Sequence, residues 1–408
     1  MLYRVSRVLV GLLLLGVLPV MGQEGPEASN LKQLEEEYNK KENSDTINKL
    51  RRGDSTGDVG IQAHLDAMNV LARYTLFRFH DTEVHDPNPA PGKKSIATIY
   101  KDFEIDMLLL TKTPAKTSGT WPVYTRAMIT QGKLALNASK PITRINAARC
   151  LARLPELEQP ELLDFYTDVL NDAGQIDAVK YFILRGTTDL LAIPKEGLLN
   201  KDSVDKSVKA LLAVVNRPGD FLPGTAETEK EGFRVLRREA IRGLAASRLP
   251  KLADGTKLGL VLLKAMNEGK TFAPPARMDE QIEAAIGLAR INPDLDKDYC
   301  PDFAANEVGS FVLGFKDFML GENKMAKLPC KVHAVRLLEA LELLDAASAK
   351  QPGPVAAHVS KIKNLAFPIL RQLQGDNPSP TQLTNLSKGL EAAVMTGGPN
   401  KSLYKGGS

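Results

Sequence analysis

The sequence lacks the short motifs that mark most enzyme active sites. It contains no phosphate-binding loop, dinucleotide fingerprint or nucleophile elbow, and its Gly-rich turns occur only as isolated pairs. Cysteine is scarce as well: Cys150, Cys300 and Cys330 are the only three, and an odd number allows at most one internal disulfide. These absences give catalysis no positive support, so a non-enzymatic protein without a cofactor is favoured.

An excess of charge of either sign is also missing. The chain has 53 Lys and Arg against 49 Asp and Glu, which gives a formal net charge of +4. Nucleic-acid-binding proteins usually carry a stripe of basic residues, so the near-equal numbers of basic and acidic residues indicate that nucleic acid is not a partner. No apolar run after residue 22 is long enough to cross a bilayer, and we expect no transmembrane span once the first residues are removed.

Those first 22 residues have the pattern of a secretory signal peptide. Arg4 and Arg7 precede an uncharged apolar run over residues 8–20, and Val20, Met21 and Gly22 suit the positions that signal peptidase reads. The run is shorter than the roughly 20 residues of a membrane-spanning helix. We expect cleavage after Gly22 and a mature protein that is secreted or lies in the periplasm or cell envelope. An uncleaved N-terminal anchor is the alternative.

Apolar residues recur with helical periodicity along most of the chain, and the alternation typical of strands is absent. Ile96, Ile99, Phe103, Met107 and Leu110 form one such amphipathic stripe. Turns that contain Pro or Gly separate most of the segments. Further helices are predicted over residues 122–134, 141–154, 160–171, 175–192, 202–215, 231–247, 257–267, 278–291, 303–320, 330–347, 355–373 and 380–395.

Four of these helices share a motif in which an Ala is followed four residues later by a Leu, with a basic residue in or beside it. The motif occupies residues 147–154, 240–247, 284–291 and 334–341. The first Ala residues are 93, 44 and 50 positions apart, which indicates repeats of roughly 45 residues. The four helices resemble the second helices of HEAT-type repeats. The resemblance implies an all-α solenoid of stacked antiparallel helical hairpins with a curved surface that binds other macromolecules.

Composition divides the chain into four parts. After the signal peptide over residues 1–22, residues 23–58 are polar and charge-dense and are predicted to form a spacer that is partly helical or disordered. Residues 59–396 form the helical-repeat domain, and a long connection over residues 216–232 is the candidate hinge between two subdomains. Residues 397–408 are predicted to be a disordered tail.

The densest group of metal-capable side chains lies in a Pro-rich loop and consists of His80, Asp81, Glu83, His85 and Asp86. Imidazole and carboxylate groups suit a divalent ion such as zinc, iron or manganese. The His-x4-His spacing in a loop matches no known motif, however, and no third ligand can be assigned. A solvated acidic loop is the favoured interpretation, and a metal site is the alternative.

A row of arginines is the candidate binding patch. Arg234, Arg238 and Arg242 recur every four residues and share one face of a predicted helix, with Arg237 beside them. Guanidinium groups bind carboxylates through two parallel hydrogen bonds, so the row suits an acidic partner. The alternative is a solvated face with local pairs to nearby glutamates.

Two of the cysteines form a candidate disulfide. Cys300 and Cys330 each lie beside a proline, at the two ends of one predicted helix, and an oxidising compartment would favour their pairing. Two reduced or buried thiols are the alternative. Cys150 lies within a predicted helix and is interpreted as a buried, inert thiol.

Taken as a whole, the sequence favours an exported, non-catalytic helical-repeat scaffold that mediates protein–protein interactions. A metal-binding protein or hydrolase that uses residues 80–86 is one alternative. A structural component of the cell envelope, with residues 23–58 as a spacer from a membrane or wall, is another.

Overall fold

The computed structural model describes residues 31–80, 94–112, 118–219, 221–222, 224–321, 324–375 and 378–406. Over these residues the protein is all-α, with two isolated β-bridges and no strand, so the expected all-α class is confirmed. None of the helices in these ranges is long and apolar enough to cross a membrane. The α-helices are α2 (Leu31–Asn39), α3 (Lys41–Arg52), α4 (Gln62–Phe77), α5 (Ile96–Thr111), α7 (Thr120–Ala135), α8 (Pro141–Leu151), α9 (Glu161–Asn171), α10 (Asp177–Leu191), α11 (Lys201–Val215), α12 (Glu227–Ser247), α13 (Leu258–Asn267), α14 (Met278–Arg290), α15 (Pro301–Leu320), α16 (Lys324–Ser348), α17 (Gly353–Gln374) and α18 (Pro380–Thr396). The short 3-10 helices are η2 (Arg78–His80), η4 (Leu154–Leu157), η5 (Gly269–Thr271) and η6 (Pro293–Leu295).

Local sequence signals explain several helix starts. The Ser95 side chain accepts a hydrogen bond from the Thr98 backbone N–H (3.2 Å) at the start of α5, which satisfies one of the free donors of the first turn. Pro141 and Pro301 occupy the first turn of α8 and α15, where the missing proline N–H removes no helical hydrogen bond. The helices therefore begin close to where the sequence places them.

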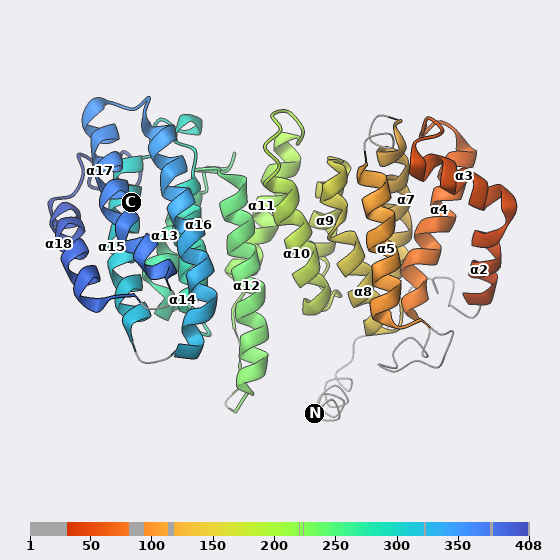
Figure 1. Cartoon of the computed structure of the whole chain (residues 1–408), viewed down its shortest axis with the longest axis horizontal. Helices are drawn as coiled ribbons and strands as arrows, with labels where there is room; N and C mark the ends of the chain where they lie inside the picture. Colours follow the sequence, from red (N-terminus) through yellow and green to blue (C-terminus); the bar gives the residue numbers. More distant parts are fainter. Residues whose placement is uncertain are drawn as a thin grey trace.

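Helices α8, α10, α12, α14 and α16 pack in succession, each against the next along the molecule (Figure 1). Helices α9, α11 and α13 each pack against the helix that follows them in sequence. The leucines of the four repeated motifs lie in the core between these helices. All of them are buried: Leu151, Leu244, Leu288 and Leu338. The periodic motif therefore marks the core-forming face of successive helices.

The connection that the sequence offers as a hinge is tied to a second loop. Residues 227–232 of the expected hinge form the first turns of α12, which packs against α10 and α14 and lies near the middle of the molecule (Figure 1). In the remaining loop, Gly219 lies so close to Ala273 that a Cβ on it would come within 1.9 Å of the Ala273 carbonyl oxygen. Only glycine permits this approach, so the loop before α12 meets the loop between α13 and α14 at this point.

The polar segment over residues 31–58 is part of the fold, which begins at α2 rather than near Val59. Helices α2 and α3 pack against α4, and Ile47 and Leu50 are at most 1% exposed. Tyr38 stacks on Tyr74 of α4, with ring centroids 4.5 Å apart. The helical alternative for this segment agrees with α2 and α3, whose few apolar side chains suffice to dock them because α4 supplies the complementary surface.

The C-terminal residues 397–406 are ordered and form a strap across the ends of distant helices, which corrects the expected disordered tail. Leu403 and Tyr404 are each 2% exposed. The Cys300 backbone N–H donates to the Leu403 carbonyl (2.9 Å), and Asn400 donates from its backbone and side chain to the Asp302 carboxylate (2.8 and 2.7 Å). The strap is too short to show periodicity, and its partners lie about 100 residues earlier in the chain.

Candidate functional site

The arginine row of α12 lies against acidic residues of α14 rather than on a free surface. Arg237 is 1% exposed and donates through Nε to Glu280 Oε1 (2.6 Å), whose carboxylate is equally buried. Arg238 pairs with Asp279 (2.7 Å). At the N-terminal end of the row, Arg234 pairs with Glu227 and lies 3.6 Å from Glu231. These three arginines therefore have carboxylate partners within the fold.

Glu283 of α14 forms the centre of this network. It is fully buried and accepts hydrogen bonds from Arg242 of α12 (2.7 Å) and from Arg336 of α16 (2.9 Å). Burial alone raises the pKa of Glu283, but the hydrogen bonds from Arg336 and Arg242 outweigh it, so the pKa stays below its ordinary value. Arg242 also contacts Glu239 (3.1 Å), which completes the pairing of the row.

His333 of α16 lies beside this centre, with Nδ1 3.4 Å from Glu283 Oε1. Burial lowers the pKa of His333, and the neighbouring arginines of α12 and α16 lower it further against the opposing effect of Glu283. The imidazole is therefore neutral near pH 7. Each arginine of the cluster has a carboxylate partner, although Arg238 Nε is buried without a hydrogen-bond partner, and the cluster connects three helices.

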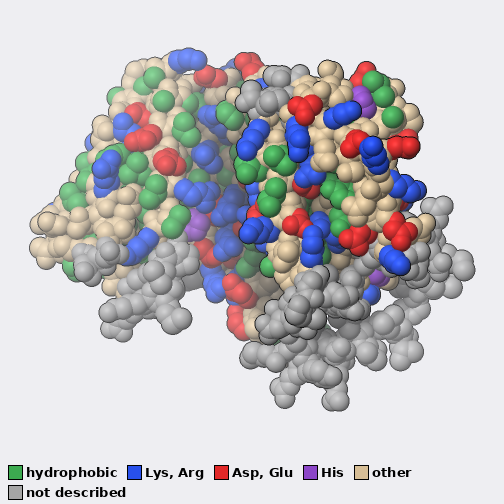
Figure 2. Space-filling view, turned by 45° about the vertical axis from the view of Figure 1, so that its right-hand side comes forward, with side chains coloured by type: hydrophobic (Ala, Val, Ile, Leu, Met, Phe, Trp, Pro, Cys, Tyr) green, Lys and Arg blue, Asp and Glu red, His purple; other side chains and the backbone are tan. Residues whose placement is uncertain are grey.

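Four further arginines of the same helix succession have no carboxylate partner within ion-pair distance among the described residues, and they are Arg144, Arg149, Arg185 and Arg290. Arg185 of α10 is exposed. Burial raises the pKa of the nearby Asp189 carboxyl, and the charges of Arg185 and Arg242 partly oppose this rise. Arg290, at the end of α14, is half-buried, and burial lowers its pKa, as do Arg336 and Arg248. Figure 2 shows Lys and Arg side chains gathered in a hollow in the middle of the molecular face that it displays.

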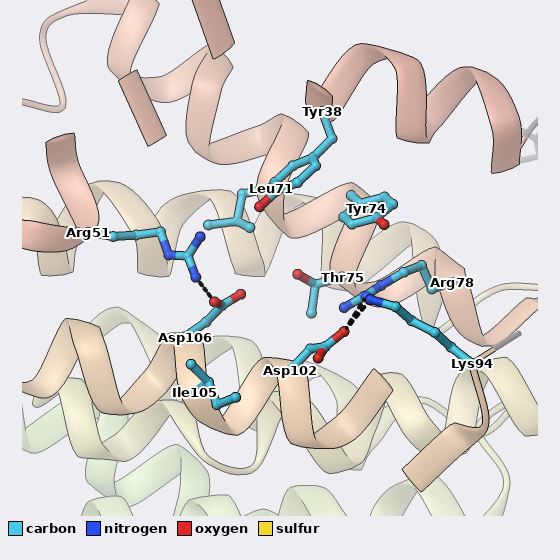
Figure 3. A pocket seen from close by; sticks show the side chains of 10 residues that line it. All are labelled: Tyr38, Arg51, Leu71, Tyr74, Thr75, Arg78, Lys94, Asp102, Ile105 and Asp106. Atoms are coloured by element: carbon cyan, nitrogen blue, oxygen red, sulfur yellow. Dashed lines mark hydrogen bonds and ion pairs between the residues drawn. The ribbon is translucent and has the colours of Figure 1, made fainter. Parts of the chain in front are cut away.

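A separate pocket of about 280 Å³ lies between α3, α4 and α5 (Figure 3). Two ion pairs cross it: Arg51 of α3 with Asp106 of α5, and Arg78 of η2 with Asp102 of α5 (3.0 Å). Its remaining lining residues are Tyr38, Leu71, Tyr74, Thr75, Lys94 and Ile105.

Asp102 holds two cations at the rim of this pocket. Its Oδ2 accepts from Arg78 and also from Lys94 (2.8 Å), which lies just before α5. Burial raises the pKa of Asp102, but the hydrogen bonds from Lys94 and Arg78 outweigh this effect and leave the pKa lowered. The carboxylate is therefore ionised near pH 7. The Arg78 guanidinium also lies over the Tyr74 ring, 4.5 Å from its centroid.

The candidate metal loop falls largely outside the described residues. Asp81, Glu83, His85 and Asp86 are not described, and His80 ends η2 with Nδ1 3.4 Å from Thr143 Oγ1. Within the described part of the chain no cluster of three or more metal-capable side chains occurs. The metal site therefore stays a prediction.

The cysteines are buried where they are described. Cys150 is buried with a free thiol, and burial raises its pKa to about 12. Cys300 is also a buried free thiol, while the side chain of Cys330 lies outside the described residues. Because the Cys330 side chain is not described, the candidate Cys300–Cys330 pairing stays a prediction.

No protein-family model, curated protein or solved structure matches the chain. The assignment of function therefore rests on the sites themselves. Sequence reasoning missed the pocket, although Asp102 and Asp106 stand four residues apart on one predicted helix, the spacing that places two carboxylates on one face. It also missed the acids of α14, whose spacing matches that of the arginines of α12.

Proposed function

We propose that the protein is an exported, non-catalytic scaffold of stacked, HEAT-like helical hairpins that binds protein partners. The succession of α8, α10, α12, α14 and α16 supports this architecture, because each helix buries its apolar face against its neighbours in the stack. The sequence pattern of residues 1–22 supports export. Such a stack offers an extended surface on which a partner segment can lie.

The observation that carries the proposal is that Arg185 and Arg290, on this succession of helices, form no direct ion pair with a described carboxylate. A guanidinium group retains its charge at all physiological pH values and binds carboxylates with two hydrogen bonds. The partner surface is therefore acidic, and its Asp or Glu side chains pair with Arg185 of α10 and Arg290 of α14. Electrostatic pairing of this kind speeds association and weakens as salt rises.

The test is affinity capture from the cell-envelope fraction of the host, with the chain from residue 23 as bait and with Arg185→Glu plus Arg290→Gln as the variant. A control bait carries Arg126→Glu plus Lys361→Glu, because both residues are exposed and lie on α7 and α17, outside the succession. A captured protein is then purified and titrated against all three baits by calorimetry. We expect saturable binding that the first variant weakens by about tenfold and the control leaves unchanged.

Equal binding to all three baits, or no protein enriched by the unmodified bait, contradicts the proposed function. Binding that persists unchanged as salt is raised contradicts the acidic nature of the partner. Circular dichroism of each bait establishes that the substitutions leave the helices intact.

A further inference from the structure

The pocket between α3, α4 and α5 contains buried donors that lack acceptors. Each guanidinium carries five N–H groups, yet Arg51 has one polar partner among the described residues, Asp106, and Arg78 bonds only to Asp102. Both side chains are about nine-tenths buried, and the Nε of each is buried without a hydrogen-bond partner. A buried Nε without a protein partner also occurs in other arginines that do not line this pocket, namely Arg73, Arg144 and Arg238. Because buried N–H groups almost always have an acceptor, the donors of Arg51 and Arg78 are available to a molecule in the pocket.

Thr75 adds a third donor. It is fully buried, lines the pocket between the two ion pairs, and its hydroxyl has no partner (Figure 3). Other buried threonines in this protein, such as Thr167, Thr187 and Thr188, donate to the carbonyl four residues earlier in their helix. Thr75 does not, so its hydroxyl remains available to a ligand. Thr125 also lacks a partner but does not line this pocket.

The charges in the pocket indicate the ligand. Three cations, Arg51, Arg78 and Lys94, meet two carboxylates, Asp102 and Asp106, so one positive charge is left over. A monoanion neutralises this excess, whereas a phosphate dianion would leave a partly buried negative charge unpaired. The volume exceeds the ~30 Å³ share of one water molecule several-fold. A planar carboxylate also matches the geometry of guanidinium donors.

We propose that this pocket binds a small organic monocarboxylate, whose oxygens accept hydrogen bonds from Arg51, Thr75 and Arg78. Lys94 at the rim draws the anion towards the opening. The site lies on the N-terminal helices and requires no protein partner, so it is a second function beside the proposed scaffold.

Calorimetric titration of the purified protein tests the proposal. The probes are acetate, benzoate and hippurate, which increase in size, together with their primary amides and inorganic phosphate. We expect at least one carboxylate to bind saturably with one site per chain, and its amide to bind about tenfold more weakly or not at all, because the charge-assisted hydrogen bonds are lost.

Two pocket variants and two matched controls locate the site. Thr75→Val preserves side-chain shape and is expected to weaken binding about tenfold while the melting temperature stays unchanged or rises. Thr187→Val, whose hydroxyl is already bonded to Ile183, is expected to leave binding unchanged and lower the melting temperature. Arg78→Met is expected to abolish binding, and Arg126→Met on the exposed face of α7 is expected to leave it unchanged.

Three results overturn the proposal. One is the absence of saturable binding by all three carboxylates. Another is equal affinity of the unmodified protein and the Thr75→Val variant, which assigns the bound anion to an unrelated part of the surface. The third is binding of phosphate or of an amide that is as tight as that of the best carboxylate. The Thr75→Val arm remains decisive even if Arg78→Met fails to fold.

Discussion

Two clusters of buried arginine and carboxylate groups differ in how fully their donors are used. In the cluster of α12, α14 and α16, Glu283 accepts from both Arg242 and Arg336, and Arg237 bonds to Glu280 and also to the Pro274 carbonyl (2.9 Å). In the pocket of α3, α4 and α5, Arg51 and Arg78 each have one carboxylate partner. Both clusters contain the same residue types.

The difference separates a structural network from a binding site. Among the described arginine and carboxylate groups of the cluster of α12, α14 and α16, only Arg238 Nε is buried without a partner, that arginine lines no described pocket, and the ion pairs hold helices together. A cluster with buried donors in excess pays a desolvation cost that only a bound acceptor or water removes. Counting partners per donor therefore distinguishes the two better than counting charges does.

Removing one partner from the matched cluster is expected to give the largest effect. Glu280→Ala leaves the guanidinium of Arg237 buried without its carboxylate, and the free energy of unfolding falls by about 3–5 kcal/mol. Urea denaturation followed by circular dichroism measures the loss. The double variant Arg237→Met plus Glu280→Met removes both charges and is expected to recover most of it. A loss below about 1 kcal/mol for Glu280→Ala contradicts the structural role of the network.

The same substitution in the pocket is expected to cost less. Asp106→Ala removes the single carboxylate partner of Arg51, whose side chain is 11% exposed and adjoins a pocket that water can enter. We expect a loss of about 1–2 kcal/mol in the same urea assay, because water can solvate the freed guanidinium. If Asp106→Ala lowers the free energy of unfolding as much as Glu280→Ala does, the two clusters do not differ in the way proposed.

The pH dependence of stability probes the histidines buried in the C-terminal half. Burial lowers the pKa of both His333 and His358 below the ordinary value of about 6.5. Below that pH the unfolded chain binds protons that the folded protein does not, so stability falls as pH drops, by at most about 1.4 kcal/mol per pH unit for each histidine.

His333→Asn plus His358→Asn is expected to flatten this dependence between about pH 6.5 and 5 in urea titrations, above the range where most carboxylates titrate. His64→Asn is the control, because His64 is half-exposed on α4. An unchanged slope in the double variant shows that these histidines do not determine the acid sensitivity.

The smallest effect is expected for the unpaired hydroxyl of the pocket. Thr75→Val removes a buried donor without a partner, so the free energy of unfolding stays unchanged or rises by up to about 1 kcal/mol. Thr187→Val is expected to lower it by about 0.5–1.5 kcal/mol, since that hydroxyl has a partner. Differential scanning calorimetry of the two variants side by side gives the comparison. If the two variants are destabilised by the same amount, the Thr75 hydroxyl has a hydrogen-bond partner in the free protein, which contradicts the prediction.

Much of the fold could be predicted from local pattern. The helices over residues 355–373 and 380–395 correspond to α17 (Gly353–Gln374) and α18 (Pro380–Thr396), because apolar periodicity and a proline near each start are local signals. The strap over residues 397–406 could not be predicted in this way. Leu403 and Tyr404 become buried only because Pro250, Cys300 and their neighbours form the surface that receives them.

The contacts that form the two sites could not be predicted from local sequence pattern either. The arginine row of α12 was visible in the sequence, but its acidic partners on α14 lie about 40 residues away, and only packing brings them together. Thr75 resembles any other helical threonine until its missing hydrogen bond is seen. The pocket brings together α3, α4 and α5, which no spacing rule connects.

The sequence by itself determined that this chain is all-helical, and it determined which face of the repeated helices is buried, because periodicity and side-chain chemistry act over a few residues. The tertiary structure decided which charges are neutralised and which donors remain unpaired. Charge neutralisation depends on distances between side chains that are far apart in the chain, and these distances exist only after the helices have packed. For that reason only the tertiary structure shows that the row of arginines pairs with carboxylates inside the fold and that the pocket of the N-terminal helices is the candidate ligand site.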